Sequence, residues 1–401
     1  MRALSKYVSQ AELEELLFNL IQLESHEEAP ALERPLAEWI AAWCHKAGIE
    51  AFVMEAPAGR FNVIARVRGD GSGPSLMLNG HLDTVPAYDM EDAFRPRVAD
   101  DRIYGRGATD MKGALASMLA VLLAVQRSGV SLAGDVCFVA TAGEETYSPG
   151  AYKLLRSGFR CDYAIVGEPT GMQVGIAHKG VLWGEAEFAG LSVHGSVPDE
   201  GVNAIYRASD WIQAIQETYI PSLKQKLHPL LGAPTVNIGM IEGGTRPVIV
   251  PNNCRIRFER RMIPGESEES VIGELQELLD GLSAESDNMR GNIRVSDNFH
   301  GVPHGPFETS SANPLISLLS HAYAEHFQTA APEPVGLQFW TEAAMFEHIG
   351  GMGTVVCGPG FIAQAHSSNE YVSRSQLWAA YMMYAAAVYR LCVRKEEASP
   401  C

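Results

Sequence analysis

The pattern of predicted strands and helices changes part way along this chain, and this change limits the folds that the chain can adopt. Up to residue 178, strand-like and helix-like segments alternate, which is typical of an α/β domain. Residues 179–297 instead run strand, helix, strand, strand, helix, strand, the order of a ferredoxin-like unit. Helices and buried strands return after residue 297. Since a single core stops growing at roughly 250–300 residues, a chain of 401 residues is expected to form more than one domain.

We therefore predict an α/β fold in which one domain is discontinuous and a second is inserted into it. Residues 1–178 and 298–401 are expected to form the discontinuous domain, a mixed sheet flanked by helices. Residues 179–297 are expected to form the inserted α+β, ferredoxin-like domain. The clearest helical periods lie in residues 112–127, 202–219 and 375–391, and the clearest buried strands in residues 75–83, 135–141 and 162–166.

Composition and charge argue against several classes of partner. The chain carries 31 Lys and Arg against 48 Asp and Glu, a formal charge of −17, which disfavours nucleic acid or an anionic membrane surface. The longest apolar run, residues 114–125, is shorter than the ~20 residues of a membrane span, and residues 1–10 lack the apolar core of a signal peptide. Seven cysteines without a CxxC pair favour a reducing compartment. We therefore expect a soluble, cytoplasmic protein.

Five short clusters place carboxylates and histidines beside the ends of predicted strands or the start of a helix. In chain order they contain His81 and Asp83, Asp110, Glu144 and Glu145, Glu168, and His366. Taken singly, each has a structural explanation: a hydrogen-bonded histidine at a strand end, a helix N-cap at Asp110, or a solvated turn at Glu144 and Glu145. Because ligands gather at the carboxyl ends of strands in open α/β sheets, the five together indicate one site.

The residue types in these clusters favour metal chemistry. A metal-bound histidine is usually held through its second ring nitrogen by a carboxylate, which fits the His81-x-Asp83 spacing. Adjacent carboxylates on a loop face different directions, so one of Glu144 and Glu145 can bind metal while the other acts as a base. The glycine-rich residues 105–113 match neither GxGxxG nor GxxxxGK[ST], which disfavours a phosphate loop.

In this order the five clusters resemble the metallopeptidase family that contains acetylornithine deacetylase, succinyl-diaminopimelate desuccinylase, aminoacylase-1 and glutamate carboxypeptidase. The resemblance covers about residues 75–372. It implies that Asp110 bridges two metals, that His81 and Glu168 complete one site and Glu145 and His366 the other, that Asp83 orients His81, and that Glu144 is the general base. Histidine and carboxylate ligands without a thiolate suit Zn²⁺ first, with Co²⁺ or Mn²⁺ as alternatives.

The inserted segment carries a second part of the resemblance. Residues 192–205 are similar to the lid-domain motif of the family, whose histidine reaches the active site of a partner subunit and stabilises the oxyanion. This implies a role for His194, with an ordinary loop histidine as the alternative, and a homodimer formed through the lid domain. Asn203 in the same segment and Gly360 near the last cluster are candidate substrate contacts.

Residues 258–265 resemble the acid-x-Arg-x-x-Pro strand of the family. Arg261 is therefore the candidate clamp for a substrate carboxylate, and Arg260 on the other strand face is expected in a structural or surface pair. Val248 stands where the family commonly has Asn, so that substrate contact departs from the pattern. Residues 177–180, 340–343 and 358–366 look most like the acetylornithine deacetylase type. Glu342 is a further active-site candidate, or else a carboxylate favoured by a helix N-terminus.

The resemblance implies a two-metal amidohydrolase that removes an acyl group from an N-acyl amino acid or related amine, in the manner of acetylornithine deacetylase. A desuccinylase of N-succinyl-diaminopimelate, another N-acyl or N-formyl amine deacylase, and a metal-dependent dipeptidase or carboxypeptidase remain alternatives. A non-catalytic binding or scaffold protein is disfavoured, because all five clusters retain their ligand side chains.

Overall fold

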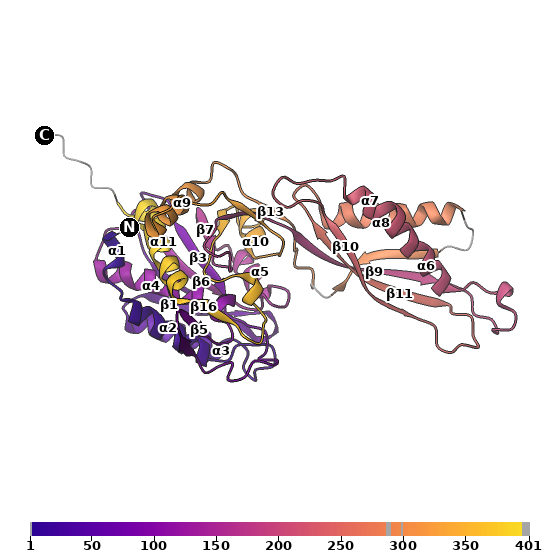
Figure 1. The fold of residues 1–401 in the computed structure, drawn as a ribbon, viewed down its shortest axis with the longest axis horizontal. Helices are drawn as coiled ribbons and strands as arrows, with labels where there is room; N and C mark the ends of the chain where they lie inside the picture. The colour runs from indigo at the N-terminus through magenta and orange to yellow at the C-terminus, as the bar shows by residue number, and fades with distance from the viewer. Residues whose placement is uncertain (1, 286–289, 298–299, 395–401) are drawn as a thin grey trace. The chain divides into compact units, whose positions relative to one another are not determined.

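A computed structural model describes residues 2–285, 290–297 and 300–394 (Figure 1). The chain separates into two compact units. The first lies within Met1–Ile176, Thr309–Val335 and Thr341–Cys401, and the second within Ala177–Glu308 and Gly336–Trp340. The first unit is thus built from segments that are distant in the sequence.

The first unit contains a twisted mixed sheet. Its strand order is β1 (Glu50–Ala56), β2 (Arg60–Val67), β6 (Val136–Thr141), β3 (Leu76–His81), β7 (Tyr163–Val166), β15 (Gly353–Val356) and β8 (Gly175–His178), and the short strands β13 (Phe307–Glu308) and β14 (Val335–Leu337) both pair with β8. The central strands β6, β3, β7 and β15 are parallel, whereas β1, β2 and β8 add antiparallel pairings. The central strands β3 and β6 are buried along their whole length, and β6 is apolar up to its last residue, as parallel strands covered by helices are.

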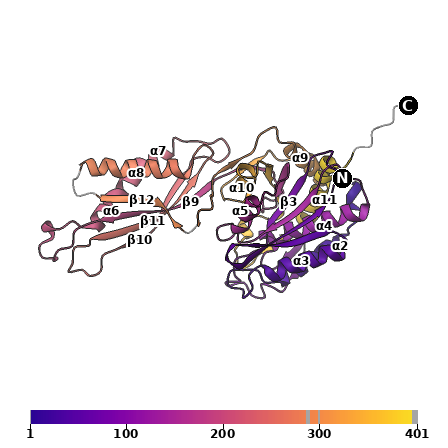
Figure 2. The same ribbon diagram turned by 180° about the vertical axis from the view of Figure 1, so that it is seen from behind.

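Helices cover both faces of this sheet. One face packs against α2 (Gln10–Gln22), α3 (Arg34–Lys46), α4 (Gly113–Ser128), α9 (Pro314–Phe327) and α11 (Arg374–Cys392). On the other face lie α5 (Pro149–Arg156) and α10 (Ala343–His348), next to each other in Figure 2. Local signals start and stop these helices: Ser9 and Glu12 form a capping box on α2, and Gly129 ends α4 with φ 64°. The predicted α/β class with a mixed sheet flanked by helices is confirmed.

Small elements complete the first unit. These are α1 (Arg2–Ser5) and a three-stranded sheet of β16 (Tyr371–Ser373), β5 (Arg102–Tyr104) and β4 (Arg97–Ala99). The small sheet ties the chain before Asp110 to the chain after His366 through the pairing of β5 with β16. It therefore brings two of the sequence clusters into one neighbourhood.

Among the described residues, one helical stretch is long and apolar enough to cross a membrane, Ala108–Ser128. Its apolar window is 100% buried inside the fold, where α4 packs against α2, α11 and the sheet. The core helix of a globular domain has this composition for the same reason, since it is apolar on every side.

The second unit has the chain order β-α-β-β-α-β. Its antiparallel sheet runs β10 (Thr235–Gly243), β11 (Asn253–Met262), β9 (Gly180–Ala189) and β12 (Arg290–Val295). One face packs against α6 (Ala204–Ala214) and α8 (Glu268–Glu285), and the short α7 (Ile220–Leu223) follows α6 after the helical residues Ile215–Tyr219. Trp211 lies in this core beside Phe188 and Phe258. The expected ferredoxin-like order of elements is present.

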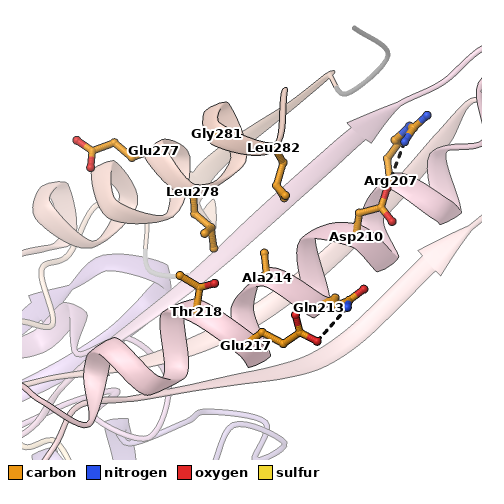
Figure 3. Close-up of a pocket in the computed structure, with 10 residues that line it drawn as sticks. All are labelled: Arg207, Asp210, Gln213, Ala214, Glu217, Thr218, Glu277, Leu278, Gly281 and Leu282. Carbon is orange, nitrogen blue, oxygen red and sulfur yellow. Dashed lines mark hydrogen bonds and ion pairs between the residues drawn. The ribbon is translucent and has the colours of Figure 1, made fainter. Parts of the chain in front are cut away.

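A groove of about 650 Å³ runs between α6, with the helical residues that follow it, and α8 (Figure 3). Arg207 pairs with Asp210 at 3.2 Å, and Gln213 donates to Glu217 at 2.9 Å. The polar side chains along this wall therefore engage neighbours on their own helix. The groove includes none of the residues singled out from the sequence.

Candidate metal centre

The parallel core of the first unit brings the ligand-bearing segments together. His81 is the last residue of β3, while Glu144 and Glu168 follow β6 and β7 by a few residues. His366 lies in the loop after β15. Because β6, β3, β7 and β15 are parallel neighbours, their carboxyl ends meet at one edge of the sheet. The sequence clusters at these ends are brought together in the structure.

A first group joins His81, Asp110 and Glu168. The His81 Nε2 atom is 2.9 Å from Asp110 Oδ1 and 3.8 Å from Glu168 Oε1. All three side chains are buried, and their ligand atoms lie within 4.8 Å of one another. This spacing suits three ligands that converge on one ion.

A second group joins Asp110, Glu145 and His366. His366 Nε2 is 3.0 Å from Glu145 Oε1 and 3.4 Å from Asp110 Oδ2. The side chain of His366 is half exposed, and its φ of 59° is a conformation that residues other than Gly rarely adopt. Asp110 takes part in both groups, with Oδ1 toward His81 and Oδ2 toward His366.

The electrostatics of the two groups favour bound cations. Burial, followed by the charge of a neighbouring carboxylate, raises the pKa of Glu144 and of Glu168 well above its usual range. Hydrogen bonds to Asp110 and Glu145 raise the pKa of His366 to about 10. A buried cluster of carboxylates therefore attracts positive charge, which two divalent ions would supply in place of protons. The donor set of imidazoles and carboxylates fits such ions.

Asp83 is buried beside His81, but its carboxylate makes a different contact from the one expected. The main-chain oxygen of Asp83 lies 2.9 Å from His81 Nδ1, whereas the nearest carboxylate oxygen is 3.7 Å away. The carboxylate instead accepts hydrogen bonds from the N–H groups of Gly143, Glu144 and Glu145 at 2.9, 3.1 and 3.0 Å. It thereby fixes the loop that carries both glutamates.

Two other predicted site residues of the first unit make internal contacts. Glu342, at the start of α10, is buried and accepts the Thr141 hydroxyl at 2.6 Å, and burial raises the pKa of its carboxyl to about 7. Gly360 has φ 86° and donates its N–H to Gln376 at 2.7 Å. A Cβ atom at Gly360 would lie only 2.7 Å from Thr109 Oγ1, which explains why glycine is needed beside the Asp110 segment.

The predicted residues of the second unit lie near its turns and on its sheet. His194 is exposed, with Nδ1 2.7 Å from the Ser196 hydroxyl. Asn203 is the N-cap of α6 and accepts the N–H of Ile205 at 2.9 Å. Val248, where the family commonly has Asn, is exposed.

The two adjacent arginines of β11 have different surroundings. Arg261 makes a two-pronged ion pair with Glu259, at 2.8 and 3.2 Å. Arg260 is buried and pairs with Glu266 at 2.6 Å. The alternation of side chains along a strand accounts for this difference.

Sequence reasoning missed a buried ion pair beside the centre, formed by Arg106 and Glu370 at 2.6 Å. Arg106 belongs to the glycine-rich cluster, and its place between two glycines was the available signal. Glu370, four residues after His366, carried no signal by itself.

The fold and this pair of ligand groups define a centre suited to two divalent ions. A sequence model of Peptidase family M20/M25/M40 matches residues 77–390, so the chain belongs to this family and is a metal-dependent hydrolase of amide bonds. It is 34% identical over 368 residues to an acetylornithine deacetylase of Myxococcus xanthus, covering 89% of this chain and 92% of the relative. An acetylornithine deacetylase of Pectobacterium atrosepticum is 30% identical over 369 residues, covering 89% and 91%.

Solved structures share the fold at lower identity. The Bacillus subtilis YXEP protein, described as a dinuclear metal binding peptidase from the M20 family, has a TM-score of 0.72 and 16% identity, covering 95% of this chain and 98% of its own. Aminopeptidase PepT from Bacillus cereus has a TM-score of 0.76 and 22% identity, with the same coverage.

Proposed function

We propose that the chain removes the acyl group from an N-acyl amino acid or related amine, as an acetylornithine deacetylase does. The observation that carries this proposal is the position of Asp110, whose two carboxylate oxygens face two separate ligand groups. The acetylornithine deacetylases that resemble the chain over about nine-tenths of its length support an N-acyl amino acid as substrate.

In this proposal Asp110 would be a ligand of both ions, His81 and Glu168 would hold one, and Glu145 and His366 would hold the other. Zn²⁺ is the first choice, with Co²⁺ or Mn²⁺ as alternatives, because the donors are imidazoles and carboxylates. Asp110 is thus the residue on which both ions depend.

Glu144 is the proposed general base and acid. Bound divalent ions lower the pKa of water and polarise a carbonyl oxygen. Glu144 accepts one proton from the water whose oxygen bonds to the carbonyl carbon, then donates it to the amine nitrogen as the amide C–N bond breaks. The products are a free amine and a carboxylic acid, which ionises at neutral pH. The position of Glu144 supports this role, because it lies beside the proposed ligand Glu145 on the loop that the Asp83 carboxylate holds, where a carboxyl group can exchange a proton with water.

Substrate recognition is proposed to use residues of both units. Arg261 binds a substrate carboxylate, which requires it to exchange its present partner Glu259 for the substrate. We propose further that residues 179–297 act as a lid and dimerisation domain, and that His194 stabilises the oxyanion in the site of a second copy. Asn203, Gly360 and Glu342 are proposed substrate contacts, and the enzyme is proposed to act in the cytoplasm.

An acyl-substrate panel tests the proposal. Purified protein loaded with Zn²⁺ or Co²⁺ is assayed against N-acetyl, N-succinyl and N-formyl amino acids and against dipeptides. Acetate release from an N-acetyl amino acid is expected to be the fastest reaction. Preferred release of succinate or of an amino acid would assign the chain to a desuccinylase or a peptidase, and no acetate release from any N-acetyl amino acid would remove the deacetylase.

The neighbouring carboxylates provide a matched pair of variants for the mechanism. Glu144→Gln is expected to lower kcat about 10²–10⁴-fold, the usual worth of acid–base catalysis, while two metals stay bound. Glu145→Gln is expected to lower the metal content, since it removes a ligand of the second group. Metal-to-protein ratios measured by mass spectrometry separate the two roles, and a fully active Glu144→Gln enzyme would contradict the assignment.

A further inference from the structure

The guanidinium of Arg106 is buried and is shared among four acceptors. Nε donates to the Pro86 carbonyl at 3.1 Å, and one terminal nitrogen donates to the Ala87 carbonyl at 3.2 Å. The other terminal nitrogen donates to the Ser367 carbonyl at 3.2 Å and to Glu370 Oε2 at 2.6 Å. A single side chain thus holds the loop that follows Asp83 and the loop that follows His366.

Glu370 adds a third segment to this arrangement. Its side chain is buried, and Oε1 accepts the main-chain N–H groups of Thr109 and Asp110, both at 3.0 Å. The second oxygen, Oε2, belongs to the ion pair with Arg106. The carboxylate therefore joins the backbone of Asp110 to the guanidinium that holds the other two loops.

Stability alone is a weak reason for such a pair. Removing two charges from water is unfavourable, and buried ion pairs can often be replaced by apolar side chains without loss of stability. The contacts of this pair, however, are directed at main-chain atoms of three segments, each within a few residues of His81, Asp110 or His366. The pair therefore holds main-chain atoms close to all three side chains.

We propose that the Arg106–Glu370 ion pair is a positioning device that sets the spacing of the two metal groups around Asp110. The proposal rests on the ligand roles given above for His81, Asp110 and His366. Partners behind metal ligands typically change metal affinity or activity by roughly 10–100-fold when they are removed. We expect removal of the pair to weaken mainly the binding of the second ion. The first ion can bind after a small shift of Asp110, whereas the second also needs the other carboxylate oxygen of Asp110 in place.

Glu370→Gln in the full-length protein tests the positioning role. The amide keeps the shape of the side chain but loses its charge and exchanges one acceptor for a donor. We expect the dissociation constant of the weaker Zn²⁺ ion, measured by calorimetric titration of metal-free protein, to rise roughly 10–100-fold. The absorption spectrum of the Co²⁺-loaded protein is expected to change as well, since it reports ligand geometry independently of turnover.

A matched control is available in Glu266→Gln, which breaks the buried Arg260–Glu266 pair of the second unit. It is expected to leave the Zn²⁺ dissociation constants and the Co²⁺ spectrum unchanged. If Glu370→Gln does not fold, Arg106→Lys decides, because it keeps the charge while losing most of the carbonyl contacts.

The outcomes separate the two proposals. Unchanged metal affinities and Co²⁺ spectrum in a folded Glu370→Gln or Arg106→Lys protein would overturn the positioning role. Wild-type protein that binds no metal, or that keeps both ions after His81→Ala, would instead overturn the ligand assignments on which it rests.

Discussion

The Asp83 carboxylate supports a prediction whose size can be derived from its contacts. Three main-chain N–H groups donate to the two oxygens of the Asp83 carboxylate. In Asp83→Asn one of these oxygens becomes an NH₂ group, which cannot accept them. At least one hydrogen bond to a charged acceptor is lost, and an N–H then faces another donor. Losses of this kind are worth about 1.5–3 kcal/mol.

If the lost hydrogen bond displaces Glu144 and so raises the free energy of the transition state by the same amount, kcat should fall. At 1.36 kcal/mol for each factor of ten, the loss corresponds to a decrease of roughly 10–150-fold. The contact between the Asp83 main-chain oxygen and His81 survives the substitution, so the first metal group should retain its ion. Initial rates of deacylation, metal content and thermal unfolding would be measured together.

Asp162→Asn is the matched control, because the Asp162 carboxylate also accepts a main-chain N–H, that of Ser75 at 2.8 Å, but lies at the other end of β3. Its kcat is expected to stay within about twofold of wild type, as for a surface change far from the chemistry. A folded Asp83→Asn enzyme with wild-type kcat would refute the loop-fixing role. Selective loss of the metal held by His81 would show instead that the carboxylate acts on the histidine.

Further predictions concern residues other than the proposed ligands, in both units. Phe138→Ala removes a fully buried ring from β6 and should cost about 3–5 kcal/mol in the free energy of unfolding, measured with urea. Gly358→Ala should greatly reduce the yield of folded protein, because its Cβ would lie 1.9 Å from the Gly167 carbonyl oxygen, and a thermal transition like that of wild type would contradict this. Burial lowers the pKa of His304 to about 4. Between pH 6.5 and 4 the unfolded chain therefore binds a proton at this residue that the folded chain does not bind, so the free energy of unfolding decreases as the pH is lowered. His304→Phe, which keeps an aromatic ring against Trp340, should lose less stability than wild type between pH 7 and 5.

The sequence predicted the centre of the first unit well because its signals there are local. Buried strands in residues 135–141 and 162–166 correspond to β6 (Val136–Thr141) and β7 (Tyr163–Val166), and the polar clusters follow directly after them. The long helix predicted at 375–391 corresponds to α11 (Arg374–Cys392). Strong apolar periodicity and parallel neighbours leave little freedom in where such strands end.

Other features depend on contacts between distant segments and could not be predicted locally. Short strands such as β16 exist only because β5 lies beside them. The Arg106–Glu370 pair joins positions 264 residues apart in the chain. At Asp83 the HxD spacing indicated a bond to the histidine, but three N–H groups of the loop after β6 compete for the carboxylate.

Asn203 of the second unit shows the opposite case, because its structural role follows from the local sequence. Asn203 directly precedes a helix, and Asn is among the preferred N-cap residues. Its side-chain oxygen accepts the N–H of Ile205, so substrate contact would require this oxygen to serve two roles.

The insertion within the first unit has a consequence for the synthesis of the protein. His81, Asp110 and Glu168 all precede the second unit in the chain, whereas His366 follows it. Because a chain is made from its N-terminus and domains fold as they emerge, the ribosome releases the first ligand group long before the second can form. A nascent chain arrested within the second unit would hold at most one complete metal-binding group, and a full pair would mark the moment at which the C-terminal segment has joined the sheet.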